Sequence, residues 1–291
     1  MHVALSHMTP DINMTPDNHI VNGLWIGTRL SNLELLTMMT FMEQGHRFRL
    51  WAYEPLETAL PAGVEVMDAN EIIPADRIFR YKHANAYGHG KGSVSGFSDI
   101  FRYKLLHDHG GWWVDMDVAC LKPLNFTEEY VFRNHHELLM VGNVMKCPKG
   151  SALMWDCYTV AAEKVTDENR DWHLPIQILN DQIESHGLSS FIKSGISNYD
   201  RWDELKRFVL GRKTPPQGYY FIHWMNEEWR SRGLDKNKVK ARSLLGQMMI
   251  DRRLMPSYYS LWDLMQEALY YSKLATYLPW LKDKTPQSIH R

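Results

Sequence analysis

The first part of the chain alternates between strand-like and helix-like segments, and this alternation limits the possible folds more than any other feature. Residues 19–27 are rich in strand-forming side chains and end in glycine, whereas residues 31–44 carry apolar side chains at helical spacing and close before Gly45. Strand-like patterns return at residues 47–53 and 64–67. Such alternation predicts an α/β fold in which helices flank a single, Rossmann-like and mostly parallel sheet.

Composition excludes several classes of protein. With 291 residues, 44% of them hydrophobic, the chain is long enough for one large domain or two small ones. Its 33 basic and 34 acidic side chains create no overall field that would attract nucleic acid. Three cysteines without C-x-x-C spacing indicate neither a disulfide framework nor a zinc site, which favours a reducing, cytoplasmic compartment. We expect residues 1–18 to be a flexible leader, because they show no periodic apolar pattern.

The most informative segment is residues 96–124, with the sequence GFSDIFRYKLLHDHGGWWVDMDVACLKPL. Its first half has the apolar spacing of a helix, for which Ser95 or Ser98 would provide the N-cap and Gly110 the end. Its second half predicts a strand over residues 112–120.

The charged side chains of this segment are expected to face one ligand. Because side chains alternate along a strand, Asp115 and Asp117 would lie on the same face. On the preceding helix, Asp99 and Arg102 are three residues apart and share a face. Two carboxylates at the end of a buried strand repel each other, and a divalent cation removes that repulsion. Since Mg²⁺ and Mn²⁺ prefer oxygen ligands and complete their shell with phosphate oxygens, the pair predicts a metal-bound diphosphate.

These residues carry a resemblance to a known family. The string S-D-I-F-R-Y-K-L-L-x(3)-G-G-W-W-V-D-M-D closely resembles the D-x-D sugar-binding region of family 32 glycosyltransferases, and it is similar to the glucosyltransferase domain of large clostridial toxins. The likeness extends upstream to HIVNGLWIG at residues 19–27 and downstream to residues 221–229, so that it covers about residues 19–230. It implies a GT-A fold, transfer of a hexose from a nucleotide-diphosphate sugar, with a UDP-sugar favoured, and retention of anomeric configuration.

The resemblance also implies roles for individual residues. Asp115, Asp117 and His223 would bind Mn²⁺ or Mg²⁺. The donor sugar nucleotide would contact Trp25, Asp99, Arg102, Asp115, Asn143, Asn226 and Trp229, with Trp25 in the base pocket. In FIHWMNEEW, Glu228 stands where related enzymes commonly have a small hydroxyl residue. Retention by double displacement would require a carboxylate beneath the anomeric carbon. Asp181 and Glu184 are available, but helix surface is the favoured interpretation of both, and no nucleophile is nominated.

We expect a catalytic domain over residues 19–242 and a helical extension packed on it over residues 243–291. Residues 257–281 mix aromatic and basic side chains, which fits either a peripheral helix at a membrane interface or a helix packed in a core or dimer contact; the packed helix is favoured. The acceptor would be a saccharide or a lipid-linked saccharide in bacterial surface polysaccharide synthesis.

Two other functions fit parts of the sequence. A metal-dependent phosphohydrolase with an aspartate nucleophile would also carry a D-x-D motif, but it expects the motif near the first strand and followed by a hydroxyl or valine side chain. Here the motif lies mid-chain, and Ala119 occupies the hydroxyl position. A non-catalytic sugar-binding protein would keep the aromatic surfaces and would need no metal-bound diphosphate.

Overall fold

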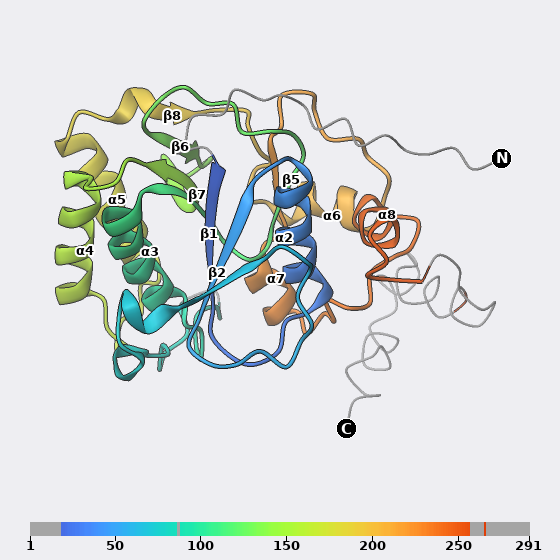
Figure 1. Ribbon diagram of the computed structural model, residues 1–291, viewed down its shortest axis with the longest axis horizontal. Coiled ribbons are helices and arrows are strands. Elements are labelled where there is room, and N and C mark those ends of the chain that lie inside the picture. The colour runs from blue at the N-terminus through green and yellow to red at the C-terminus, as the bar shows by residue number, and fades with distance from the viewer. Residues whose placement is uncertain (1–18, 86–87, 257–264, 266–291) are drawn as a thin grey trace.

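The computed structural model describes residues 19–85, 88–256 and 265. Its centre is a seven-stranded sheet (Figure 1). In spatial order the strands are β3 (Glu65–Asp68), β2 (Arg47–Ala52), β1 (Ile20–Trp25), β4 (Gly111–Val114), β7 (Met140–Cys147), β6 (Val131–Asn134) and β8 (Ile192–Lys193). Only β7 runs against its neighbours, and the other pairings are parallel. The predicted α/β class with a mostly parallel sheet is confirmed.

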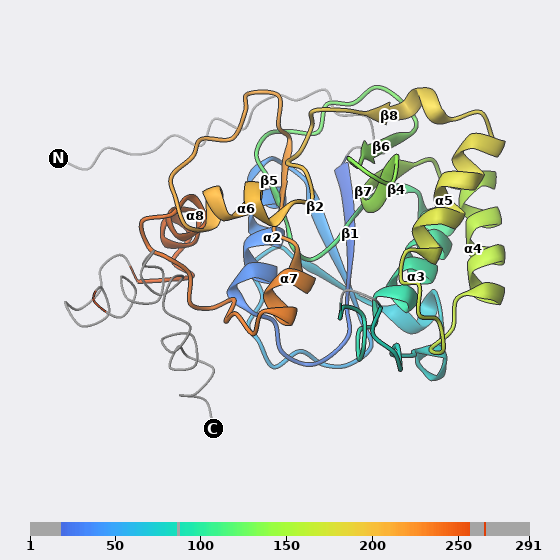
Figure 2. The same cartoon turned by 180° about the vertical axis from the view of Figure 1, so that it is seen from behind.

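Helices cover both faces of this sheet (Figures 1 and 2). One face packs against α3 (Ser95–His109), α4 (Ala152–Lys164) and α5 (Leu174–Ser185). The other face packs against α2 (Asn32–Glu43). The remaining helices are α6 (Trp202–Val209), α7 (Asn226–Ser231), α8 (Leu244–Asp251) and the short 3-10 turns η1 (Ala69–Glu71), η2 (Ala75–Arg77) and η3 (Ser189–Phe191).

Helix α2 begins where the sequence predicts it. The Ser31 side chain caps the helix and Glu34 returns a hydrogen bond to the Ser31 backbone, which makes a capping box. Helix α3, in contrast, does not begin with the predicted cap. Its N-cap residue is Val94, without a side-chain cap, so the expectation for Ser95 or Ser98 is wrong.

The strand predicted over residues 112–120 is two strands in two sheets. Strand β4 ends at Val114, and Val118 begins β5 (Val118–Cys120), which pairs antiparallel with β9 (Phe221–His223) in a separate two-stranded sheet. The prediction of one continuous strand in a single sheet is therefore wrong. Side-chain alternation reports which face a residue occupies, but it carries no information on which neighbour accepts the backbone hydrogen bonds.

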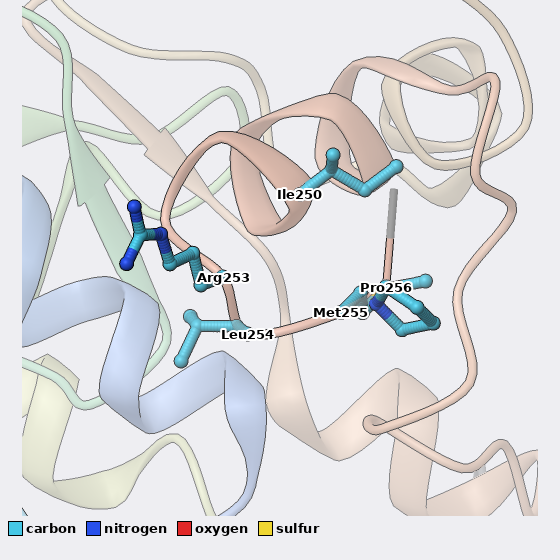
Figure 3. A pocket seen from close by; sticks show the side chains of 5 residues that line it. All are labelled: Ile250, Arg253, Leu254, Met255 and Pro256. Atoms are coloured by element: carbon cyan, nitrogen blue, oxygen red, sulfur yellow. The ribbon is translucent and has the colours of Figure 1, made fainter. Parts of the chain in front are cut away.

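Helix α8 is the described part of the predicted C-terminal extension. It packs against α6 and α2 through buried side chains that include Leu245 and Met249. Beyond it, Arg253, Leu254 and neighbouring residues line a pocket of about 390 Å³ (Figure 3). Residues 1–18 and the proposed membrane or packing helix at residues 257–281, apart from residue 265, lie outside the described residues. No helix in the described part is long and apolar enough to cross a membrane.

Candidate donor and metal site

The D-x-D segment forms a turn between β4 and β5, and its backbone is held from two sides. The Asp115 N–H donates to the Asn143 carbonyl of β7 at 2.9 Å, which continues the pairing of β4 for one residue. The Trp224 N–H donates to the Asp117 carbonyl at 2.8 Å. The turn therefore lies where the main sheet meets the small sheet, and it presents both aspartates there.

Asp99, Arg102 and Asp115 form one ion cluster, in which Asp99 and Arg102 are buried and Asp115 is partly exposed. The Arg102 Nη2 lies 3.1 Å from Asp99 Oδ1 and 3.1 Å from Asp115 Oδ1, so a residue of α3 bridges to the D-x-D turn. Trp113 Nε1 also donates to Asp115 Oδ1 at 2.8 Å, and the Arg102 guanidinium lies 5.2 Å from the centre of the Trp113 ring. The shared helix face predicted for Asp99 and Arg102 is confirmed. Among the three, the Asp115 side chain is the most accessible, with 29% of its surface exposed.

Burial dominates the electrostatics of these carboxyl groups. It raises the pKa of Asp99 to about 7, although Arg102 opposes the shift. Burial also raises the pKa of Asp115, with Arg102 opposing and the neighbouring Asp117 adding to the increase. Added positive charge at Asp115 would therefore favour its ionised form.

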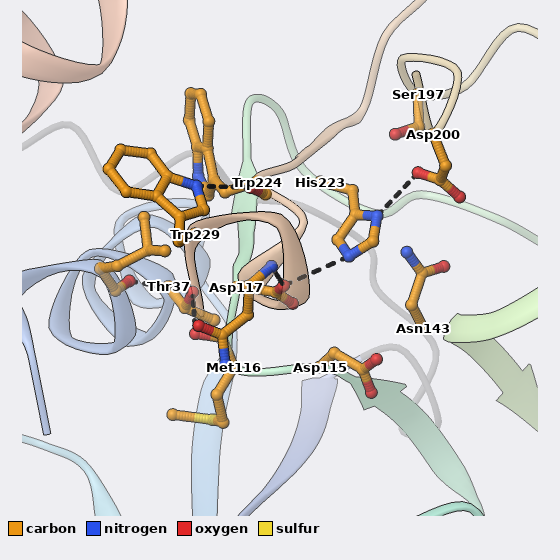
Figure 4. A network of polar contacts seen from close by, with 12 residues as sticks. Thr37, Asp115, Met116, Asp117, Asn143, Ser197, Asp200, His223, Trp224 and Trp229 are labelled. Carbon is orange, nitrogen blue, oxygen red and sulfur yellow. Dashed lines mark hydrogen bonds and ion pairs between the residues drawn. The ribbon is translucent and has the colours of Figure 1, made fainter. Parts of the chain in front are cut away.

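The second aspartate belongs to a chain of three side chains, Asp117, His223 and Asp200 (Figure 4). His223 Nδ1 lies 2.7 Å from Asp200 Oδ1, and its Nε2 lies 3.3 Å from Asp117 Oδ2. Burial alone would lower the pKa of His223, but the two carboxylates outweigh it and raise that pKa to about 10. Burial raises the pKa of Asp117, yet His223 and the Asn226 N–H together lower it below its ordinary value.

Arg133 fixes the position of Asp200, the last member of this chain of side chains. Its guanidinium is buried and donates to both carboxylate oxygens of Asp200, at 2.7 and 2.8 Å, and to the Asn198 carbonyl. It also donates to Asn143 Oδ1 at 3.2 Å. The Asn143 amide nitrogen is buried without a hydrogen-bond partner among the described residues, and Figure 4 shows this side chain beside His223 and Asp115. Buried polar groups are normally hydrogen-bonded, so this unpartnered donor beside the turn is a candidate ligand contact.

Neither Arg133 nor Asp200 is among the site residues predicted from sequence. For Arg133, the available signal is a charged side chain in the buried strand β6. Asp200 lies in the irregular segment before α6, where no periodic pattern marks it.

The side chains around the D-x-D turn are of the types that bind a divalent cation. Two carboxylates and an imidazole, completed by phosphate oxygens, suit Mn²⁺ or Mg²⁺. A histidine that binds metal commonly donates its other ring N–H to a carboxylate, and Asp200 occupies that position at His223 Nδ1. In the part of the chain that the structure describes, no three acidic, histidine or cysteine side chains converge on one cation position.

A pocket of about 420 Å³ adjoins this turn, and we call it the Trp25 pocket. It is lined by Trp25, Asn226, Trp229, Arg230, Gly233, Leu234 and Lys236. Its link to the D-x-D turn is Asn226, whose backbone N–H donates to Asp117 Oδ2. The Trp25 ring is half-buried, whereas Trp229 is buried and donates its indole N–H to the Trp224 carbonyl. The predicted site residues therefore lie in two adjoining groups. One group lines the Trp25 pocket and consists of Trp25, Asn226 and Trp229. The other surrounds the D-x-D turn and consists of Asp99, Arg102, Asp115, Asp117, Asn143 and His223.

Residues 55–133 match a family model described as a glycosyltransferase sugar-binding region containing a DXD motif. The resemblance recognised in the sequence is thereby confirmed for the segment that holds Asp99, Arg102, Asp115 and Asp117. Among solved structures, the PaToxG glycosyltransferase is similar at 12% identity and a TM-score of 0.38, over 58% of this chain and 69% of that one. A transferase with two cysteine-to-serine substitutions is similar at 10% identity and a TM-score of 0.37, over 71% of this chain and 94% of that one. No curated protein matches the sequence.

Proposed function

We propose that this chain is a metal-dependent, retaining glycosyltransferase that moves a hexose from a nucleotide-diphosphate sugar, with UDP as the favoured carrier, to a saccharide acceptor. The observation that carries the proposal is the position of the D-x-D turn. It adjoins the Trp25 pocket on one side and the Asp99–Arg102 pair on the other. A base in the pocket, a diphosphate at the turn and a sugar beside Arg102 would follow the order of groups in such a donor.

Different residues of the site would bind the metal, the diphosphate and the sugar of the donor. Asp117 and Asp115 would hold Mn²⁺ or Mg²⁺. His223, which its raised pKa keeps protonated in the free protein, would release the Nε2 proton to solvent and contribute that nitrogen, while Asp200 fixes its ring. When bound, the cation would stabilise the negative charge that grows on the leaving diphosphate. Asn143 would donate its unpartnered amide N–H to a sugar or phosphate oxygen. Asp99 lies close to Arg102, so a sugar hydroxyl would meet an ion pair rather than an isolated acid.

The finer parts of the proposal concern stereochemistry and acceptor. Asp181 and Glu184 are exposed on α5, which favours their interpretation as helix surface. We therefore nominate no protein nucleophile for the retaining reaction. The acceptor would be a saccharide or lipid-linked saccharide of bacterial surface polysaccharide, met in the cytoplasm, with membrane contact through residues 257–281 as the less favoured alternative.

The test is thermal stability with Mn²⁺ together with UDP, with GDP, or with neither. A ligand that binds only the folded state raises the unfolding midpoint by mass action. One diphosphate should raise the midpoint of the wild type in a metal-dependent manner, and Asp117→Ala should abolish the rise. The matched control Asp181→Ala removes an exposed acid of α5 and should respond like the wild type. An equal response from Asp117→Ala and the wild type would contradict the role of Asp117.

A further inference from the structure

Lys236 is a cation in the wall of the Trp25 pocket. Its Nζ lies 5.6 Å from the centre of the Trp25 ring, and it forms an ion pair with Glu34 of α2. Only 20% of the Lys236 side chain is exposed, and its ammonium is paired with the buried Glu34 carboxylate. It comes from the segment that follows α7, more than 200 residues away from Glu34 along the chain.

We propose that Lys236 binds the diphosphate of the donor and makes the Trp25 pocket selective for a nucleoside diphosphate over the nucleoside. The inference rests on the proposed function and adds to it a residue outside the D-x-D region. Lys236 would neutralise part of the negative charge of the phosphates, while Trp25 would stack on the base.

The need for such a cation follows from the charges around the D-x-D turn. Asp115 and Asp117 already bring two negative charges there, and a diphosphate brings more. Lys236 lines the same pocket as Asn226, whose backbone N–H donates to Asp117 Oδ2, so the ammonium and the D-x-D turn border one cavity. A phosphate bound between Asp117 and Trp25 would thus lie within the field of this ammonium.

Two cationic side chains among the described residues line the pocket, Arg230 and Lys236. Lys236 is the better placed of the two to bind a phosphate. Arg230 uses Nε and Nη2 on the Glu227 carboxylate, at 2.7 and 2.6 Å, and its side chain is 46% exposed. Its Nη1 donates to the Lys91 carbonyl at 3.1 Å. Solvent and these partners satisfy Arg230, so its charge contributes little inside the pocket.

The ion pair with Glu34 does not prevent contact with phosphate. An ammonium has three N–H donors, so Lys236 can bond Glu34 and a phosphate oxygen together. Glu34 is also stabilised from its own helix. Its Oε2 accepts from the backbone N–H and the hydroxyl of Ser31, and it lies in the first turn of α2, where the helix dipole favours a negative charge.

The experiment measures binding of UDP, GDP, uridine and guanosine by calorimetry in the presence of Mn²⁺. The principal variant is the double substitution Glu34→Gln with Lys236→Met, because Lys236→Met alone would leave a buried glutamate without its cation. Losing a hydrogen bond to a charged group weakens binding by roughly 10- to 100-fold. We expect that loss for the diphosphate that the wild type binds, with nucleoside affinity unchanged.

Three controls separate the possible outcomes. Glu34→Gln alone should bind the diphosphate like the wild type, and Lys236→Arg should retain most of the affinity. Lys238→Met, in the same segment but outside the pocket, should also bind like the wild type. Equal diphosphate affinity in the double variant and the wild type would overturn the assignment of Lys236 alone. A wild type that binds neither diphosphate would overturn both this inference and the proposed function.

Discussion

The substitution Arg133→Met tests whether the buried network behind His223 is held by one guanidinium. Arg133 is 1% exposed, and its ion pair with Asp200 is bidentate. Its removal would leave three acceptors without this donor: the Asp200 carboxylate, the Asn198 carbonyl and Asn143 Oδ1. Breaking a buried ion pair by deleting one partner costs about 3–5 kcal/mol, because a buried charge stays uncompensated. Because His223 remains paired with Asp200, we expect the free energy of unfolding to fall by about 3 kcal/mol, the lower end of that range.

The assay is urea unfolding followed by circular dichroism, with the slope of the transition checked for constancy. The matched control is Arg47→Met, which deletes an arginine from the ion pair with Glu65, where the arginine side chain is 59% exposed. Surface pairs contribute about 0–1 kcal/mol, so this variant should unfold within that range of the wild type. If Arg133→Met lowered the free energy of unfolding no more than Arg47→Met does, the network would not depend on Arg133. The assignment of Arg133 to the site would then be wrong.

Three further predictions concern other parts of the molecule. Ser31→Ala removes the side-chain cap of α2 and should lower the free energy of unfolding by about 1 kcal/mol, measured by urea unfolding. Gly110→Ala should cost about 1–3 kcal/mol or more, because Gly110 has a φ of 68° and an added Cβ would lie 2.5 Å from the Lys149 nitrogen; a change below 0.5 kcal/mol would argue against this turn. Chelation by EDTA should abolish the midpoint shift caused by the nucleoside diphosphate while leaving the midpoint of the free protein unchanged.

Local sequence patterns were sufficient for the first half of the fold. Ser31 and Gly45 mark the two ends of α2, and the strands β1, β2 and β3 follow from β-rich segments between turns. These features depend on neighbours within one or two turns of the chain, so the sequence displays them directly. The reversed strand β7 and the small sheet of β5 and β9 depend on partners distant in sequence, and no local pattern specifies them.

The residues of the candidate site also fall into those that a local sequence pattern predicts and those that depend on distant contacts. Asp99, Arg102, Asp115 and Asp117 lie within one short segment, so the chain itself keeps them near one another. The predicted reason for the pairing of Asp115 and Asp117 is wrong, because they lie in a turn and do not share one strand face. His223 was predicted through the resemblance of its strand. Its partner Asp200 acquires its place only when the segment before α6 folds against β6, a contact that spacing does not encode.

The central claim is that Asp115 and Asp117 share a divalent cation whose remaining positions are filled by diphosphate oxygens. The most direct measurement is anomalous diffraction at the manganese edge from crystals grown with Mn²⁺ and the nucleoside diphosphate that stabilises the protein. The account predicts one anomalous peak beside the Asp117 carboxylate, in contact with the diphosphate. A diphosphate bound elsewhere, or a manganese peak away from the D-x-D turn, would contradict it.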